Sequence, residues 1–370
     1  MNIKLRLGYG LGALAIALIV LVIVNFVLPG FVMGPSSTPV VVRGYYGGEK
    51  SQFLANPEVQ RILQSKYNIT VQARSAGSTE MARDMALTPQ DDFIWPSNGV
   101  SVALYKERGG QLVASENIFN SPLVIYSWAE ITDALIRNGI VEKRGETYFI
   151  VKSQEFIDLM NAGKKWSDIG LPNIAGKVVV RTTDPNFSNS GLMFAGLMAC
   201  MLNGGETPDD VAADRILPSL TTFFSRLGFM EQKSNDLFQQ YLTTGAGARP
   251  LVAGYESQLI EFAIQNPQVV PQIKKDVRVL YPVPTLWSSH PFVARTSAGK
   301  RLLEALKDPE IQAIAWQQHG FRSGLPGVVN DPNHLPVSGV PATIDGVVDM
   351  PSWSVMDRIL TALGSKTPVR

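Results

Sequence analysis

The sequence predicts an α/β protein of two lobes, preceded by one membrane-spanning helix. Short β-branched runs alternate with segments of helical periodicity, which is typical of parallel sheets built from β-α-β units. The pattern restarts beyond Trp128, and 370 residues exceed what one compact core holds in most folds. Residues 7 to 42 contain no charged side chain, and their first part is almost purely aliphatic.

The N-terminal segment predicts a membrane anchor. Residues 7–28 reach the roughly 20 residues that a transmembrane helix needs, whereas a signal-peptide core has only about 7–15. Lys4 and Arg6 precede this run, and the positive-inside bias then orients the globular part outside the cytoplasm. We therefore expect a single-pass protein of the inner or cytoplasmic membrane, with a periplasmic or extracellular globule. A cleaved signal peptide is the alternative.

Composition excludes some other classes. Apolar residues make up 45% of the chain and charged residues 18%, which describes a globular protein. The net charge of +1 gives no support to a nucleic-acid partner. Cys200 is the only cysteine and lies in an apolar run, so we expect it to be a buried hydrophobe, without a disulfide or a cysteine metal site.

The elements follow in order after the Pro/Gly/Ser-rich linker at residues 29–39. In the first part we expect strands at 39–43, 69–74, 92–95 and 123–126, and helices at 56–66 and 80–85. The next part predicts a helix at 130–138, a hairpin near 142–147, a helix at 154–162, a strand at 178–180, helices across 191–243, a strand at 249–254, a helix at 258–265 and a strand at 277–281. The last part predicts a strand near 292–293, one long helix at 298–318 and a late helix at 353–363.

The junctions between strands and helices carry the candidate site. The stretch "RTTDPNFSNSG" at 181–191 is rich in hydroxyls, amides and small residues, and "RGYYGGEKS", "RSAGSTE" and "WPSNG" stand at other strand ends. In open α/β sheets, ligands bind at the carboxyl ends of strands, where helix N-termini present free N–H groups. Arg43, Arg74 and Arg181 open three of the junctions, and a guanidinium suits a carboxylate or tetrahedral oxyanion. Helix capping and structural ion pairs are the alternative explanation.

Several segments together resemble the extracellular solute-binding proteins of the type II periplasmic-binding fold, which serve as substrate-binding proteins of ABC transporters. The segments are "KWSDIG", "GKVVVRTTDPNFSNSG", "GYESQLIEF", "VLYPVPTLWSSHPF" and "WQQHGFRSG", and the resemblance covers residues 40 to 325. It implies two lobes with crossings near Trp128 and Tyr281. The chain then divides into an anchor and linker at 1–35, lobe 1 at 36–128 plus 282–370, and lobe 2 at 129–281.

The resemblance also implies that a small ligand is held between the lobes, which close by hinge bending. The expected function is a membrane-tethered, extracytoplasmic solute-binding protein for transport or sensing, with an oxyanion or carboxylate ligand, a membrane permease or sensor as partner, and no cofactor or metal. An anchor in place of the family's cleaved signal or lipid-bearing cysteine favours a tethered sensor or accessory role. The candidate ligand residues are Arg43, Gly47, Gly48, Glu49, Arg74, Gly77, Ser78, Thr79, Ser97, Asn98, Arg181, Thr183, Asp184, Ser188, Asn189, Ser190, Tyr255, Glu256 and Ser257.

Two other classes stay open. One is a tethered interaction module whose cleft is vestigial, and the other is a hydrolase. Residues 254–258, "GYESQ", superficially resemble a nucleophile elbow, but the serine is one place late and the second glycine is absent. His290, His319 and His334 form no metal-like pair, and we expect no enzyme. Aromatic residues near the strand ends either stack on an organic ligand or belong to the core, namely Tyr45, Tyr46, Trp95, Trp287 and Trp353.

Overall fold

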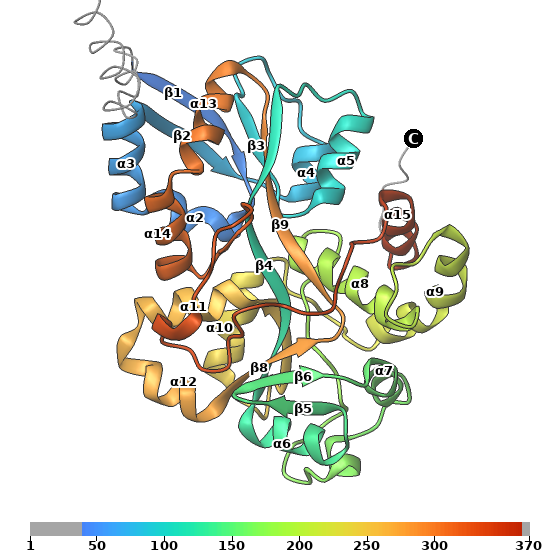
Figure 1. The fold of residues 1–370 in the computed structure, drawn as a ribbon. Helices are drawn as coiled ribbons and strands as arrows, with labels where there is room; N and C mark the ends of the chain where they lie inside the picture. The colour runs from blue at the N-terminus through green and yellow to red at the C-terminus, as the bar shows by residue number, and fades with distance from the viewer. Residues whose placement is uncertain (1–38, 365–370) are drawn as a thin grey trace, which may run out of the picture.

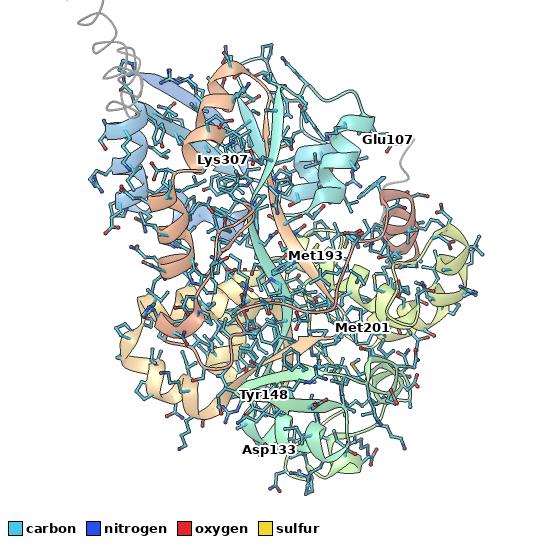
Figure 2. All side chains as sticks on the ribbon, in the orientation of Figure 1. Glu107, Asp133, Tyr148, Met193, Met201 and Lys307 are labelled. Atoms are coloured by element: carbon cyan, nitrogen blue, oxygen red, sulfur yellow. The ribbon has the colours of Figure 1, made fainter. Side chains whose placement is uncertain are left out.

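The computed structural model describes residues 39–364 and shows two α/β lobes joined by the long strands β4 (Ala114–Trp128) and β9 (Thr285–Ala294) (Figure 1). In Figure 2, Glu107 and Lys307 lie on lobe 1, and Tyr148 and Asp133 lie toward the opposite end of the molecule on lobe 2. The two-lobed α/β organisation predicted from the sequence is confirmed. The predicted membrane segment at residues 7–28 lies outside the described residues. Among residues 39–364, no helix combines the length and apolar character that crossing a bilayer requires.

Lobe 1 contains a mixed sheet in the order β2-β1-β3-β9-β4. Its first three strands are parallel, as β-α-β units require, and β9 and β4 are antiparallel additions. The strands are β1 (Val40–Tyr46), β2 (Ile69–Ser75) and β3 (Phe93–Trp95), with the two long strands. Its helices are η2 (Gly48–Lys50), α2 (Ser51–Ala55), α3 (Pro57–Tyr67), α4 (Ser78–Arg83), α5 (Gly99–Glu107), α13 (Ser297–Leu306) and α14 (Pro309–His319).

Lobe 2 is built on the second half of β4, which pairs antiparallel with β7 and β8. The other strands are β5 (Val141–Arg144), β6 (Thr147–Ile150), β7 (Leu251–Tyr255) and β8 (Val277–Pro282). Its helices are α6 (Ala129–Arg137), α7 (Ser153–Asn161), η3 (Trp166–Ile169), α8 (Asn189–Leu202), α9 (Asp210–Ser225), α10 (Ser234–Thr244), α11 (Glu256–Gln265), η4 (Pro267–Val269) and α12 (Val270–Asp276).

Strand β4 carries the chain from one lobe to the other without a break. It pairs with β9 as far as Pro122 and with β7 from Leu123 onward. The first crossing therefore lies inside β4, at Pro122–Leu123, rather than near Trp128 as the sequence suggests. The return crossing follows β8 and enters β9, close to the predicted position at Tyr281.

The C-terminal segment makes a third passage between the lobes. After β10 (Arg322–Ser323), which pairs with β4 in lobe 1, the chain returns to lobe 2, where Val337 and Val340 are buried against its core. It continues through η5 (Pro332–His334), β11 (Val347–Val348) and α15 (Trp353–Ala362). The sequence-based division assigns residues 282–370 to lobe 1. Strand β9 and helices α13 and α14 do belong there, whereas the described segment after β10 packs largely on lobe 2 (Figure 1).

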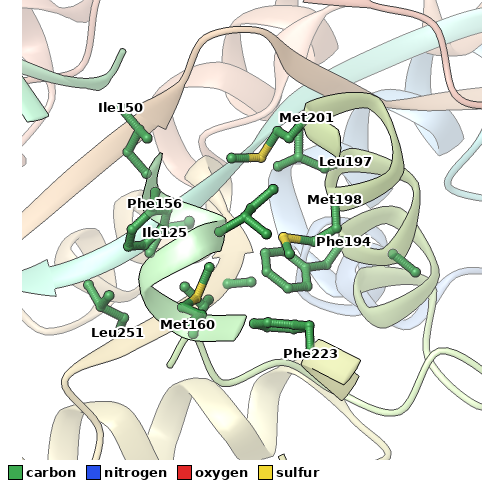
Figure 3. Close-up of a cluster of buried hydrophobic side chains, with 14 of the residues drawn as sticks. Ile125, Ile150, Phe156, Met160, Phe194, Leu197, Met198, Met201, Phe223 and Leu251 are labelled. Atoms are coloured by element: carbon green, nitrogen blue, oxygen red, sulfur yellow. The ribbon is translucent and has the colours of Figure 1, made fainter. Parts of the chain in front are cut away.

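The largest apolar core lies in lobe 2 around α8. Almost every side chain of this helix is buried, including Phe194, Met198 and Cys200, because helices and the sheet surround it (Figure 3). Figure 3 shows Phe194 and Met198 directed toward Phe223 of α9 and Met160 of α7. This packing fixes α8 rigidly, so its N-terminus holds a defined position at the interlobe cleft.

Two predicted elements differ from the structure. Residues 178–180 form no regular strand, and only isolated bridges at Lys177 and Arg181 flank them. The predicted long helix at 298–318 is two helices, α13 and α14. Asp308 separates them and caps α14, whose first residue is Pro309, because proline lacks the N–H that a continuous helix would need.

Candidate functional site

The candidate site is a cleft of 440 Å³ between the lobes. It lies at the carboxyl ends of β1 and β2, where lobe 1 contributes small and hydroxyl residues. Lobe 2 contributes the starts of three long helices, α8, α10 and α11. The lining consists of Gly47, Gly48, Glu49, Ser51, Ser75, Ala76, Gly77, Ser78, Phe187, Ser188, Asn189, Ser190, Gln232, Lys233, Ser234, Asn235 and Tyr255. The cleft is therefore lined by the ends of strands and the starts of helices, not by the faces of these elements.

The helix starts of lobe 2 give this cleft a positive electrostatic character. The residues before α8 and α10 are Ser188 and Lys233, and neither helix has a side-chain cap on its first N–H groups. At the start of α11, by contrast, the Ser257 N–H donates to the Ser121 hydroxyl at 3.2 Å, and Gln258 accepts the hydrogen bond of the Tyr255 N–H. Uncapped N–H groups and the helix dipole both favour an anion at the starts of α8 and α10.

The segment before α8 is organised by its own hydroxyls. The hydroxyl groups of Thr183 and Ser190 lie 2.7 Å apart, and Ser188 and Ser190 lie 3.0 Å apart. Gly191 lets this loop fold onto the helix, since an added Cβ would lie 2.3 Å from the Thr183 carbonyl oxygen. The density of small and hydroxyl residues in this stretch thus has a packing cause, and Ser188 and Ser190 also line the cleft.

A hydrogen-bonded chain crosses from lobe 1 to lobe 2 at the edge of the cleft. The Asn98 amide donates to Asn189 Oδ1 at 2.5 Å. The Asn189 amide in turn donates to the Tyr255 hydroxyl at 2.9 Å and more weakly, at 3.4 Å, to the Ser97 carbonyl. Both polar atoms of the Asn189 side chain are therefore engaged by the protein. Its contacts hold the lobes together.

A buried charge cluster lies beneath the lobe 1 side of the cleft. Lys50 is fully buried, and its Nζ lies 2.5 Å from Glu49 Oε1, 3.0 Å from Ser97 Oγ and 3.0 Å from His290 Nδ1. Ser97 also donates to Glu49 Oε1. The Lys50 ammonium lies 5.5 Å from the centre of the Trp95 ring, which adds a cation–π contact. A buried lysine is tolerated here because a carboxylate and two neutral groups surround it.

This cluster shifts the pKa of each titratable member. Burial tends to raise the pKa of Glu49, but the charge of Lys50 and the His290 hydrogen bond outweigh it and hold that pKa well below its usual value. Burial lowers the pKa of Lys50, and the Glu49 charge opposes this change. Burial and then the Lys50 charge lower the pKa of His290 to about 4, so His290 is neutral at pH 7.

One carboxylate oxygen of Glu49, Oε2, is available to a ligand in the cleft. The contacts of Glu49 with Lys50, Ser97 and His290 all use Oε1, and among residues 39–364 no hydrogen bond engages Oε2. Because Glu49 stays ionised and lines the cleft, Oε2 can accept a hydrogen bond from a ligand. The cleft thus combines one acceptor in lobe 1 with anion-favouring helix starts in lobe 2.

The sequence-predicted residues divide by position. Nine of them line the cleft: Gly47, Gly48, Glu49, Gly77, Ser78, Ser188, Asn189, Ser190 and Tyr255. Four others adjoin the lining residues or their loop, namely Ser97, Asn98, Thr183 and Asp184. Thr79 follows Ser78 in α4 and is not part of the lining.

The three predicted arginines do not reach this cleft. Arg43 and Arg74 line a separate hollow on lobe 1, because β1 and β2 extend past them to Tyr46 and Ser75. Arg181 donates from Nη1 to the Leu227 carbonyl and so fixes a loop of lobe 2. The positive character of the cleft comes from helix starts and Lys233 instead.

Glu256 and Ser257, at the start of α11, hold lobe 2 to β10 and to the lobe 1 part of β4. Glu256 is buried and forms a two-pronged ion pair with Arg322, at 2.6 and 2.9 Å, and it accepts the Tyr281 hydroxyl at 2.7 Å. Ser257 is also buried, and its hydroxyl lies 3.2 Å from that of Ser121 rather than beside a histidine. The serine of the "GYESQ" segment therefore has no nucleophile-and-base geometry.

Sequence reasoning missed residues of two kinds. Lys233 and its neighbours line the cleft, and the "KSN" start of α10 is a helix-start signal of the same type as the predicted junctions. Phe187 lies within a predicted stretch and is an exposed aromatic side chain at the lining. The contact between Lys50 and His290 had no such signal, because it joins segments 240 residues apart. Within residues 39–364, no group of three or more His, Cys, Asp or Glu side chains could hold a metal ion.

Comparison with solved structures identifies the fold. The iron-bound HitA from Pseudomonas aeruginosa has a TM-score of 0.57 at 12% identity, covering 88% of this chain and 97% of that one. A substrate-binding protein of an ABC transporter from Agrobacterium tumefaciens has 0.55 at 15%, covering 89% and 97%. The sulfate-binding protein SubI from Mycobacterium tuberculosis has 0.52 at 14%, covering 86% and 96%.

The chain therefore has the fold of the substrate-binding proteins of ABC transporters, which is the type II periplasmic-binding fold. This confirms the resemblance seen in the sequence. No family model matches the chain. No curated protein matches it either.

Proposed function

We propose that this protein is an extracytoplasmic solute-binding protein, tethered to the membrane through residues 7–28, that closes on a small solute between its lobes. It delivers the solute to a membrane permease or reports it to a membrane sensor. One observation carries the proposal: strand ends of lobe 1 and helix starts of lobe 2 line one cleft of 440 Å³. A ligand that contacts both lobes favours the closed state by its differential affinity for that state.

The charges of the cleft define the solute class. An acidic group of the solute binds at the starts of α8 and α10, beside Lys233, where uncapped N–H groups are available. A hydroxyl or amino group of the same solute donates to Glu49 Oε2. A fully deprotonated oxyanion without a donor is disfavoured, because Glu49 is itself ionised.

The size of the cleft favours an organic solute. A volume of 440 Å³ lies within the range of about 300–1,000 Å³ that is usual for organic ligands. The exposed ring of Phe187 offers an apolar surface for the carbon skeleton of such a solute. We therefore propose hydroxy acids, amino acids and sugar acids as the first classes to test.

A thermal-shift screen of the full chain tests the proposal. Hydroxy acids, amino acids, sugar acids, inorganic oxyanions and neutral sugars are compared, and a true ligand at a hundredfold excess over its Kd adds about 2.7 kcal/mol of stability. Lys233→Ala should weaken binding of whichever solute raises the melting temperature of the unmodified protein. Lys106→Ala is the matched control, because Lys106 is an exposed lysine on α5, away from the cleft lining.

Two outcomes would contradict the proposal. If no solute in any class raises the melting temperature, the cleft does not bind a small molecule. If only neutral sugars raise it, and Lys233→Ala has no effect, then the acidic-group requirement fails.

A further inference from the structure

Arg43 and Arg74 lie on one face of the lobe 1 sheet. In the parallel β1–β2 pair, Arg43 is opposite Gln72 and Tyr45 is opposite Arg74. Side chains two residues apart on a strand share a face, so both arginines project from the same surface. Their diagonal spacing is roughly 8 Å between backbones, from a rise of about 3.3 Å per residue and a strand spacing of about 4.8 Å.

The two arginines line a hollow of 440 Å³ that is separate from the interlobe cleft. Segment 86–91, which follows α4, forms its other wall, including Thr88, Gln90 and Asp91. The buried Arg295 fixes this segment, because it donates hydrogen bonds to the Thr88 carbonyl at 2.8 Å and also to the Asp91 carbonyl. The hollow therefore has a fixed wall on one side and two long cationic side chains on the other.

Neither guanidinium has a protein partner in the described part of the chain. Among residues 39–364, neither Arg43 nor Arg74 forms an ion pair within 4.0 Å or donates a side-chain hydrogen bond to the protein. The acid in the lining, Asp91, directs Oδ2 to the Thr88 N–H at 2.6 Å and to the Thr88 hydroxyl at 2.9 Å. It is engaged by its own loop instead of by the arginines.

We propose that this hollow is a second binding site, for a small oxyanion such as phosphate, sulfate or the equivalent group of an organic ester. Two guanidiniums present several N–H donors in forked geometry, which suits the oxygens of such a group. An oxyanion between them also removes the repulsion between two like charges on neighbouring strands. The site is independent of the interlobe cleft and of the function proposed for it.

A fluorescent label at the hollow tests this site directly in the full chain. The chain's single cysteine, Cys200, is buried, so Gln90→Cys can be labelled selectively at the exposed rim. Titration with inorganic phosphate and with sulfate should give a saturable signal. Arg43→Gln/Arg74→Gln should weaken the midpoint by at least about tenfold, because each charge-assisted hydrogen bond contributes to binding. Arg61→Gln is the matched control and should leave the midpoint unchanged, since Arg61 is an exposed arginine on α3, away from this hollow.

Equilibrium dialysis with labelled phosphate gives a second readout. The unmodified protein should bind one phosphate more than the Arg43→Gln/Arg74→Gln variant. Equal stoichiometry in both proteins, or an unchanged midpoint in the double variant, would overturn the proposal. Lys233→Ala should leave the Gln90→Cys signal intact, and the double arginine variant should leave the solute-induced thermal shift intact. These two controls distinguish a loss of binding at the Arg43/Arg74 hollow from a loss of binding at the interlobe cleft.

Discussion

The side chains of Asn98 and Asn189 join the two lobes through a hydrogen bond of 2.5 Å. Asn98 caps α5 in lobe 1, where it also accepts the Ser101 N–H, and Asn189 is the first residue of α8 in lobe 2. Both residues are thus anchored in rigid helices. The relative position of the two lobes is therefore held in part by contacts that the protein makes with itself.

Replacing Asn189 with Ala should shift the protein toward an open state. The change removes the acceptor for the Asn98 amide and the donor to the Ser97 carbonyl, which both join the lobes and together contribute about 1–2 kcal/mol. Spin labels at Glu107→Cys and Asp133→Cys, on opposite lobes in Figure 2, should report a longer mean distance by electron paramagnetic resonance. Asn333→Ala, at an exposed asparagine of η5, should leave the distance unchanged. An identical distribution in Asn189→Ala would show that this contact does not control closure.

Acidification should destabilise the protein through His290. Its pKa is lowered to about 4 from an ordinary value of 6.5, so between these pH values the unfolded chain takes up a proton that the folded protein does not. Stability is therefore lost as pH falls from 6.5 to 4, by roughly 3 kcal/mol at most. Glu49, whose pKa is also lowered, adds a further loss below its ordinary value of 4.5.

Urea denaturation at pH 7 and pH 4.5 measures this pH effect. His290→Asn, which keeps an acceptor for Lys50, should reduce the difference between the two pH values. His334→Asn replaces an exposed histidine and should leave the difference as it is in the unmodified protein. A His290→Asn protein with the full pH dependence would assign the effect to other groups.

Replacing Glu256 with Gln should strongly destabilise the protein where α11 of lobe 2 meets β10 of lobe 1. The substitution leaves the Arg322 guanidinium buried without its counter-charge, and breaking a buried pair in this way costs about 3–5 kcal/mol. Chemical denaturation should show the loss at neutral pH. Glu142→Gln breaks an exposed pair with Arg144 and should change stability little. A Glu256→Gln protein as stable as Glu142→Gln would contradict the role assigned to this pair.

Replacing Gly191 with Ala should disturb the loop before α8. The new Cβ would lie 2.3 Å from the Thr183 carbonyl oxygen and 2.8 Å from backbone atoms of Asp184 and Pro185. Overpacking of this kind costs about 1–3 kcal/mol. A lower melting temperature and faster amide exchange across 183–190 should follow. Gly247→Ala, where the added atom meets nothing within 4 Å, is the control, and equal effects of the two changes would rule out the steric explanation.

The strand and helix pattern of the sequence predicted most of the two-lobed α/β fold, but strand lengths decided what the site contains. Arg43 was expected at the end of its strand, yet β1 continues to Tyr46. A residue inside a strand points to a face of the sheet, whereas a residue beyond its end can face the cleft. The glycines that follow β1 do reach the cleft, because they stand past its last residue.

Features that join distant segments could not be predicted in this way. The first half of β4, "ASENIFNSP", carries polar side chains and a proline, so its pattern does not resemble a buried strand. Its length is set by pairing with β9. The contacts of Lys50 with His290 and of Asn98 with Asn189 likewise arise only when the fold is complete.

Helix α15 rests against both halves of the molecule. Its Trp353 packs on the apolar cluster of α4 and α5 as well as on that of α8, while Arg358 pairs with Asp214 of α9. The two lobes therefore cannot separate unless α15 loses its contacts with one of them.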